Sequence, residues 1–586
     1  MIRARAGQSP RPLSPGQAVA TSPSSDRIRG LARSLHPVGL AVALLFFTWS
    51  MTPSLLPRVW SLQAVATGIS IATGYGLGCL LAWIVRRCGV SPDYSGRLRR
   101  IGWWTLAAVA AVAVPTFLIL GSWWQQITRD LVGVERIDRA NFLLILVLAL
   151  AVAVLLLAAA RGIRRGTAGL TRVATRYLPV PAARVVAVAL VVLIAVLSIN
   201  GVVYRGLIGA ADQLASAADH GTADGVEQPV APERSGSPAS TQAWESLGKE
   251  GRTFVAGGPS AQQITEVTGR PAATPIRVYA GHHAAGSIEE AAELVVDELH
   301  RTGAFDRSVL AVATTTGRGW VNARVAAGLE YTAGGDSAIA SMQYSFLPSP
   351  LAFLADRESP QVAGRALFEA VERVVGSRPE RERPMLVTFG ESLGSFGGQS
   401  AFSGAQDMVA RTDGALWVGT PNFSPQWTYI TDHRDAGSPE RLPVIDGGER
   451  VRFAADGQDL ALHHATDRDP AIDSARDPAP WGSPRVVYWQ HASDPITWWS
   501  IDLLVKRPDW LREPLGPDLD PGVRWLPFVT FWQVTMDMVF SADVPEGHGH
   551  SFGPDAARMW AAILDPTGWT DQDTDRVYTA IAGGAV

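Results

Sequence analysis

A serine flanked by glycines follows an apolar run in the middle of the chain. Residues 384–398 read PMLVTFGESLGSFGG and contain the pattern G-x-S-x-G, with Ser392 at its centre. In a strand-to-helix turn this pattern presents the serine hydroxyl at a helix N-terminus, where free backbone N–H groups favour a developing negative charge. The pattern arises easily by chance in a chain with 57 glycines. The apolar run before it and the small residues after it nevertheless favour a nucleophile over a structural turn.

A nucleophilic serine needs backbone donors for the oxyanion that forms on the substrate carbonyl. The N–H of Leu393, directly after the serine, is expected to be one donor. The second is expected in the loop after an earlier strand, and Thr316 and Gly317 follow the apolar run 309–314. Glycines after a strand are also common in ordinary turns, which is the competing interpretation.

The acid and the base are expected to follow the serine in the chain, in that order. Residues 485–493 (RVVYWQHAS) contain the expected strand 486–489 and lead to Asp494, and we expect this carboxylate to orient the base. The structural alternative is an Asp that begins a turn or caps a helix before Pro495. Further on, His548 and His550 each follow a glycine. The local pattern does not separate them; we favour His550 as the base and His548 as its support.

A metal site is the alternative explanation of the His-x-His pattern. It would need further ligands, and only Asp543 and Glu546 lie close by in the sequence. The hydrolytic interpretation is therefore favoured, and it requires no metal and no cofactor. Both cysteines, Cys79 and Cys88, precede the candidate residues. The C-terminal half thus has neither a cysteine nucleophile nor a disulfide.

The elements around these residues alternate between strand and helix. Alternation of this kind predicts an α/β fold with a mostly parallel sheet that is covered by helices on both faces. Strands are expected at 276–279, 309–314, 339–344, 385–389, 415–418 and 486–489, and helices at 289–300 and 363–375.

Five long apolar runs occupy the N-terminal third of the chain. Each has about 17–25 residues, the length of a transmembrane helix. They run over 38–56, 62–85, 101–123, 141–160 and 184–204. No acidic or histidine residue lies deep inside them, which disfavours a transporter. Arginines concentrate before the first run and in the loops after the second and the fourth. This places the N-terminus in the cytoplasm and the C-terminal domain outside the cell membrane.

The chain is therefore expected to have four parts. Residues 1–35 are a disordered cytoplasmic N-terminus, 36–208 a five-helix transmembrane domain, 209–246 a linker, and 247–586 an α/β-hydrolase domain. A polar insertion at about 421–480 is expected to form a cap. The net charge of −4 and the lack of a basic stripe disfavour a nucleic acid partner.

These features together resemble a bacterial family of membrane-bound α/β-hydrolases that was formerly a domain of unknown function. In the membrane half the resemblance rests on residues 52–58 (TPSLLPR) and 74–76 (GYG). In the C-terminal half it rests on 316–321 (TGRGWV), 343–345 (QYS), 389–394 (FGESLG), 437–439 (GSP) and 547–550 (GHGH). The resemblance implies a five-helix membrane domain joined to a hydrolase domain, but it implies no substrate.

The leading hypothesis is a membrane-anchored serine hydrolase that cleaves acyl esters through an acyl-enzyme. Cell-envelope lipids are the first substrate class to consider, because the anchor holds the domain beside membrane lipid. An acyltransferase with the same triad is the nearest alternative, and a non-catalytic membrane scaffold is a third. The aromatic residues between Asp494 and His548 suit either an acyl-binding wall or core packing, and the sequence does not determine the oligomeric state.

Overall fold

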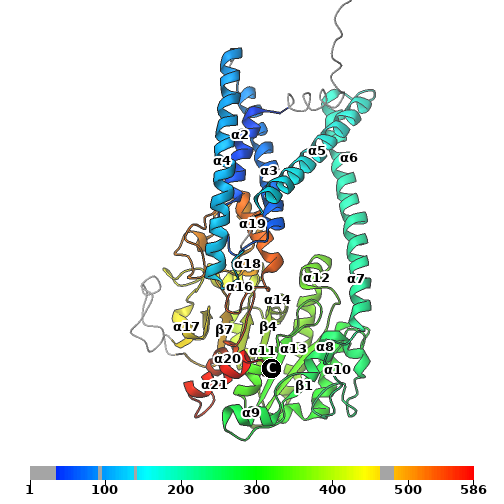
Figure 1. Ribbon diagram of the computed structural model, residues 1–586. Coiled ribbons are helices and arrows are strands. Elements are labelled where there is room, and N and C mark those ends of the chain that lie inside the picture. Colours follow the sequence, from blue (N-terminus) through cyan, green and yellow to red (C-terminus); the bar gives the residue numbers. More distant parts are fainter. Residues whose placement is uncertain (1–34, 90–94, 138–140, 462–480) are drawn as a thin grey trace, which may run out of the picture.

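The computed structural model describes residues 35–89, 95–137, 141–461 and 481–586. It has an apolar helical part and an α/β part, which lie one above the other in Figure 1. The expected disordered segment, residues 1–35, lies outside the described residues except for its last position.

Among the described residues, five apolar helices form the N-terminal part. Four are long and apolar enough to cross a membrane, as expected of a membrane protein: α3 (Trp60–Arg87), α4 (Gly96–Leu131), α5 (Phe142–Ala174) and α6 (Val180–Leu197). The expected first span is corrected, because α2 (Pro37–Ser50) has only 14 residues. At about 1.5 Å per residue such a helix falls short of the roughly 30 Å hydrocarbon layer. The prolines at 53 and 57 explain the early end, since proline disfavours helix at its own position and the one before.

The connection to the α/β part is more ordered than a linker. From α6 the chain continues through a π-helical turn (Ser198–Tyr204) into α7 (Arg205–Asp219). Residues after α7 pack on the α/β part, where Ser235 and Thr241 donate hydrogen bonds to the buried Glu298 carboxylate at 3.0 and 2.8 Å. The expected linker at 209–246 is thus a helix followed by a packed segment.

The α/β part is built on seven parallel strands in the order β1-β3-β2-β4-β5-β7-β6. All six expected strands are present, and their ends shift by at most two residues. The strands are β1 (Ile276–Ala280), β2 (Val309–Thr314), β3 (Ser337–Met342), β4 (Met385–Glu391), β5 (Gly414–Val418), β6 (Val451–Ala454) and β7 (Arg485–Trp489). β6 lies inside the expected cap at 421–480 but extends the main sheet beside β7; residues 462–480 of that segment lie outside the described residues.

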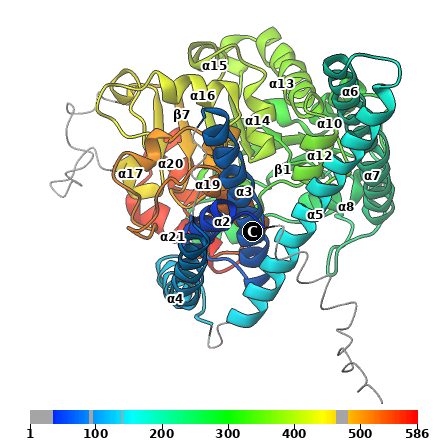
Figure 2. The same cartoon turned by 90° about the horizontal axis from the view of Figure 1, so that it is seen from above.

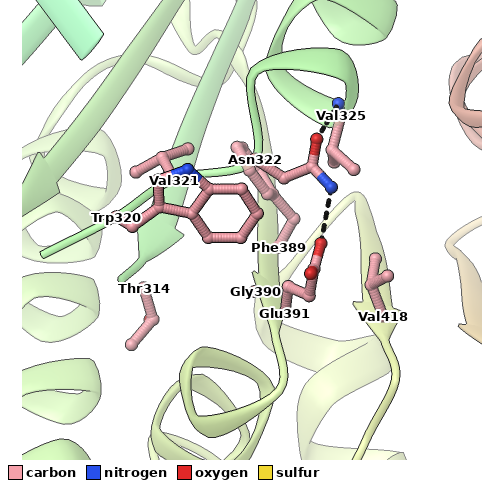
Figure 3. Close-up of a pocket in the computed structure, with 9 residues that line it drawn as sticks. All are labelled: Thr314, Trp320, Val321, Asn322, Val325, Phe389, Gly390, Glu391 and Val418. Atoms are coloured by element: carbon pink, nitrogen blue, oxygen red, sulfur yellow. Dashed lines mark hydrogen bonds between the residues drawn. The ribbon is translucent and has the colours of Figure 1, made fainter. Parts of the chain in front are cut away.

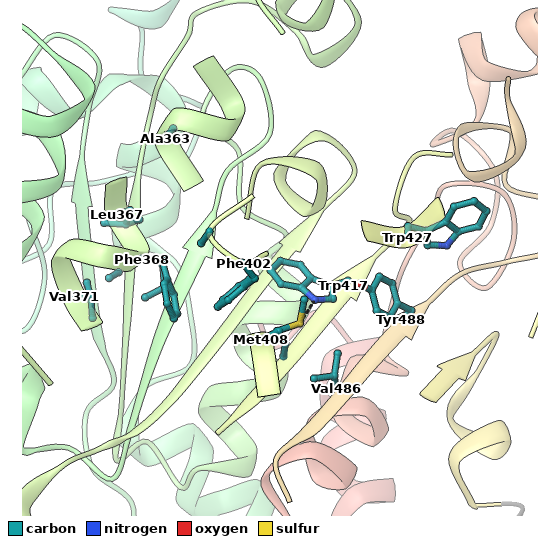
Figure 4. Packing of buried hydrophobic residues seen from close by; sticks show 14 of the residues in the cluster. Ala363, Leu367, Phe368, Val371, Phe402, Met408, Trp417, Trp427, Val486 and Tyr488 are labelled. Atoms are coloured by element: carbon teal, nitrogen blue, oxygen red, sulfur yellow. Dashed lines mark hydrogen bonds between the residues drawn. The ribbon is translucent and has the colours of Figure 1, made fainter. Parts of the chain in front are cut away.

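Alternating strand residues enter two apolar cores, one on each face of the sheet. Figure 4 shows Trp417 and Tyr488 from the strands packing in the same cluster as Leu367 and Phe368 of α13 (Ser359–Ser377). α10 (Ile288–Thr302) covers the same face. The opposite face packs against α8 (Gly248–Ala256), α11 (Ala323–Thr332) and α20 (Ala556–Leu564). Burial on both faces explains why these strands are continuously apolar.

The carboxyl ends of the strands point toward the apolar helices. The helices that follow β3, β4, β5 and β7 all lie on that side of the sheet in Figure 1. They are α12 (Ser349–Ala355), α14 (Leu393–Gln399), α16 (Pro425–Asp432) and α18 (Pro495–Trp498). In an open α/β sheet, ligands bind outside this edge. The edge of the sheet at which a ligand would bind therefore lies next to the apolar helices.

The loop between α2 and α3 enters the α/β part. Gln533 of α19 (Val529–Asp537) donates a hydrogen bond to the Thr52 carbonyl at 3.0 Å. The Asp537 carboxylate accepts hydrogen bonds from the Ser54 hydroxyl and from the Leu55 N–H. Leu55 is only 1% exposed and belongs to the main apolar core of the α/β part. The stretch TPSLLPR is thus the structural joint between the two parts.

Candidate active site

Ser392 occupies a strained turn between β4 and α14. Its φ is 56°, a value that L residues rarely adopt and that costs about 1–3 kcal/mol. The turn is held by the Ser392 N–H, which donates to the Val418 carbonyl at 2.9 Å. A Cβ atom on Gly390 would lie 2.5 Å from the Gly394 backbone, and one on Gly394 would overlap the Thr314 carbonyl oxygen. Both glycines of the pattern are therefore needed for this close approach.

Asp494 and His550 form a buried pair at the end of β7. The His550 Nδ1 atom lies 2.7 Å from Asp494 Oδ2, and the carboxylate side chain is fully buried. Asp494 also caps α18, because its Oδ1 accepts a hydrogen bond from the Ile496 N–H at 2.8 Å. The catalytic and the capping interpretation of Asp494 are thus compatible, since each uses a different carboxylate oxygen.

The His550 imidazole stands beside the serine turn. A Cβ on Gly419, the residue after β5, would lie 2.5 Å from His550 Cε1. The carbonyl of the preceding residue, Val418, accepts the hydrogen bond from the Ser392 N–H. Among the described residues, the buried Nε2 atom of His550 has no hydrogen-bond partner. In free enzymes the contact between base and nucleophile is often long and tightens with substrate.

The charges around His550 favour its protonated form. Burial alone lowers the pKa of the imidazole, but the charge and hydrogen bond of Asp494 outweigh it, and Glu391 adds to the effect. The net pKa of His550 is raised above its usual 6.5. An imidazole that gains a proton easily is suited to act as a general base.

His548 lies at a different carboxylate. Its Nδ1 atom is 3.6 Å from Asp518 Oδ2, and 28% of its side chain is exposed. The structure thus pairs Asp494 with His550 rather than with His548. In the part of the chain that the structure describes, no group of three or more His, Cys, Asp or Glu side chains could hold a metal ion.

Buried residues that have no catalytic sequence pattern hold the loop of His550. His491 Nδ1 lies 2.9 Å from the Gly549 carbonyl, and the Ser493 hydroxyl accepts a hydrogen bond from the Gly549 N–H at 2.8 Å. The His550 N–H donates to the Ser541 carbonyl at 2.7 Å. His491, which is 2% exposed, is therefore a buried support of the loop that carries His550.

Glu391 is a second buried acid, directly before the serine. Its carboxylate accepts a hydrogen bond of 2.6 Å from Asn322, which in turn caps α11 through the Val325 N–H (Figure 3). Burial raises the pKa of Glu391 to about 7, although the charge of His550 and the Asn322 hydrogen bond lower it and Asp494 raises it again. Glu391 occupies the variable position before the serine in G-x-S-x-G, so the pattern did not predict a buried acid there.

The three expected oxyanion donors are not equally available. Leu393 is the first residue of α14, so its N–H has no carbonyl partner within the helix. The Thr316 N–H donates to the Trp320 carbonyl at 3.0 Å, and the Gly317 N–H donates to the Ser349 hydroxyl at 3.3 Å. In this conformation the Thr316–Gly317 loop lies against the serine helix. Its two N–H groups already donate hydrogen bonds within the protein, so neither is free for an oxyanion.

The aromatic residues after Asp494 mostly serve the core. Trp498 and Trp510 are 1% and 5% exposed and belong to the main apolar cluster. Core packing thus explains them better than an acyl-binding wall does.

Two family models match the chain. An alpha/beta-hydrolase family matches residues 276–577, and an alpha/beta-hydrolase family N-terminus matches residues 51–259. No curated protein and no solved structure matches it. The first match covers more than half of the chain, and the parallel sheet and serine turn agree with it. The chain therefore belongs to this alpha/beta-hydrolase family.

Proposed function

We propose that the protein is a membrane-anchored serine hydrolase that cleaves acyl esters through an acyl-enzyme on Ser392. The observation that carries this proposal is the buried Asp494–His550 pair beside the strained serine turn. A carboxylate on Nδ1 fixes the imidazole so that its Nε2 atom is free to accept a proton.

The reaction has two balanced steps. First, His550 Nε2 takes the proton of the Ser392 hydroxyl while Oγ bonds to the ester carbonyl carbon. The oxyanion accepts a hydrogen bond from the Leu393 N–H, and the alcohol leaves with the proton from His550. Second, a water loses a proton to His550 and attacks the acyl-enzyme. The acid departs and the proton returns to Ser392.

The membrane is the proposed source of the substrate. The C-terminal ends of α3 and α5, which carry Arg86 and Arg87 and the arginines of 161–172, lie at the end of the helices far from the sheet (Figure 1). The positive-inside rule then puts that end in the cytoplasm and the hydrolase part outside. Because the carboxyl edge of the sheet faces the apolar helices, esters of cell-envelope lipids are the substrates within reach.

A fluorophosphonate probe tests the proposal on the full-length protein in detergent. We expect the wild-type protein to be labelled and Ser392→Ala to be unlabelled. Ser400→Ala is the matched control, because this serine caps the C-terminus of the same helix and its hydroxyl donates a hydrogen bond to the Phe396 carbonyl at 3.1 Å. Folded wild-type protein that is not labelled would overturn the proposal.

An acyltransferase would use the same acyl-enzyme and replace water by an acceptor alcohol. Product analysis with an acyl ester, with and without a lipid alcohol, distinguishes the two reactions. Free fatty acid in both mixtures supports the hydrolase, whereas transfer to the alcohol as the main reaction contradicts it.

A further inference from the structure

Exposed apolar side chains of the α/β part gather at one edge of its sheet. Of the large apolar side chains that are exposed in the described residues after α7, all except Val230 lie in connections that leave the carboxyl end of a strand. These are Leu354 and Val362 after β3, Tyr429 after β5, and Ile501, Val505, Val539 and Phe540 after β7. Single exposed apolar residues are normal on a protein surface, but their concentration at one edge marks an interaction surface.

The four residues after β7 adjoin the ends of the apolar helices, and we call them the apolar rim. Ile501, Val505, Val539 and Phe540 are 59%, 70%, 57% and 40% exposed. Ile501 begins the 3₁₀ turn Ile501–Leu504, which packs on α19, and the turn Met538–Phe540 continues α19. α19 in turn packs on α2 and α3, and it lies at the ends of these helices in both views (Figures 1 and 2).

The chain between the α/β core and α3 is short. Leu55 belongs to the same apolar core as Leu503 and Phe531, which flank the rim, and α3 begins at Trp60. At about 3.4 Å per residue, the segment from Leu55 to Trp60 spans at most about 17 Å. The head-group layer of a bilayer extends about 5–8 Å beyond the hydrocarbon on each side. The carboxyl edge is therefore held at the membrane surface and does not stand off from it on a spacer.

The helices present apolar side chains at the same end. Trp60 at the start of α3 is 38% exposed, Trp123 in the last part of α4 is 58% exposed, and Leu143 at the start of α5 is 72% exposed. In Figure 1 these ends of α3, α4 and α5 lie toward the sheet. The lipid around the helices thus reaches the level at which the rim is exposed.

The residues beside the rim suit the depth of lipid head groups. Trp499 and Trp525 are half-buried, and tryptophan is enriched where a membrane meets water. Asp502 and Lys506 are exposed and flank the apolar side chains of the first turn. Charged groups are costly in hydrocarbon but not among head groups, so this edge fits a shallow position in the leaflet.

A partner protein is the alternative occupant of the rim. Seated there, it would have to displace the lipid that surrounds the neighbouring ends of α3 and α5. Because the rim adjoins helices that are long and apolar enough to cross a membrane, lipid already lies next to it and needs no further binding partner.

We propose that the apolar rim inserts into the adjacent leaflet of the bilayer, so that the α/β part itself binds the lipid surface. The four side chains enter the region where head groups meet acyl chains, as the apolar face of an interfacial helix does. The proposal concerns lipid binding and does not depend on hydrolysis at Ser392.

A fluorophore on the rim of the full-length protein tests the proposal. Val505→Cys and Val539→Cys are made separately in a background with Cys79→Ser and Cys88→Ser, which removes both native thiols. Each is labelled with bimane and reconstituted in phosphatidylcholine vesicles. Val230→Cys is the matched control, because this valine is 86% exposed and lies shortly before Arg234, which bridges to Arg277 near the amino end of β1.

Phosphatidylcholine that is brominated in the acyl chain close to the head group should quench bimane at Val505 and Val539. Leu143→Cys on α5 should be quenched as well, whereas Val230→Cys should keep its fluorescence. Quenching at Leu143 without quenching at either rim position would overturn the proposal, and so would equal quenching at Val230. A protein over the rim would shield bimane from brominated lipid and from aqueous iodide alike, a result that also contradicts it.

A second measurement rests on the proposed function as well. The double variant Val505→Asp, Val539→Asp should lower kcat/KM for a long-chain ester in vesicles by about tenfold, an effect of about 1.4 kcal/mol. A water-soluble short-chain ester should be cleaved at the wild-type rate, and Val230→Asp should leave both rates unchanged. Equal losses on the two esters would contradict a role in lipid binding. Failure of the wild type to cleave either ester would instead count against the proposed function, and the quenching result would stand on its own.

Discussion

Arg58 and Asp537 form an ion pair that joins the membrane part to the hydrolase part. The Arg58 Nε and Asp537 Oδ1 atoms lie 3.5 Å apart, and both side chains are buried, with 1% and 0% exposed. Burial raises the pKa of Asp537, although the charge of Arg58 opposes this. Asp537 ends α19, and the chain then runs to Ser541, whose carbonyl holds the His550 N–H. The loop between α2 and α3 thus helps to hold the segment that carries His550.

Breaking this pair should destabilise the whole protein. Asp537→Ala leaves the Arg58 charge buried without a partner, which costs about 3–5 kcal/mol. We expect a lower Tm in detergent and a smaller labelled fraction of Ser392 at a given temperature. Arg136→Ala removes the exposed partner of Asp130 and serves as the control, with no measurable change expected. Equal Tm values for the two variants would contradict a structural role of the buried pair.

The two late histidines should differ sharply in their effects. His550→Ala removes the proposed base, which contacts Asp494, and we expect the rate of ester cleavage to fall by about 10³-fold or more. His548→Ala removes a partly exposed side chain beside Asp518 and should retain most of the activity. Labelling rates of the two variants are the measurement. Greater loss in His548→Ala would show that the other imidazole is the base.

Glu391 should set the pH range of activity. The base must be unprotonated to act, so activity should rise with pH through the raised pKa of His550. Ionised Glu391 stabilises the protonated imidazole, and its own pKa is about 7. Glu391→Gln removes that charge and should lower the pKa of His550. The kcat/KM–pH profile should then shift toward acidic pH, and a shift toward alkaline pH would contradict the argument.

A methyl group at Gly394 should disrupt the serine turn. Alanine is favoured over glycine in a helix by about 0.5–1 kcal/mol, but here its Cβ would overlap the Thr314 carbonyl oxygen. We therefore expect Gly394→Ala to lower the Tm and to slow labelling. Gly376→Ala in α13 is the control, since its Cβ position is open and the substitution should be neutral or stabilising. A Tm for Gly394→Ala at or above that of wild type would be evidence against the tight turn.

The sequence correctly predicts those strands and helices whose pattern is set by neighbouring residues. The strand 309–314 is an unbroken apolar run between turn signals, and its observed bounds are those expected. β6 was missed because it is only four residues long and contains Arg452, so it lacks the pattern of a buried strand. Pro53 and Pro57 indicate that α2 is short. The predicted span 38–56 rested on hydropathy alone and therefore extended past Pro53.

The candidate site was predictable only where the backbone dictates a residue type. A strained turn demands glycines around Ser392, and the sequence shows them. The support from His491, Ser493 and Asn322 depends on segments that meet only in the folded chain. The choice between His548 and His550 is of the same kind, because both follow a glycine and only tertiary packing decides which imidazole faces Asp494.

Leu55 has a bearing on how the two halves can be separated. This side chain comes from the loop between two N-terminal helices, yet it fills the principal core beneath the catalytic edge. An excised fragment beginning at residue 220 would carry a void where Leu55 packs and would lose the counter-ion of Asp537. The α/β part is consequently not independent of the helical part; the shortest piece expected to fold includes the loop between α2 and α3.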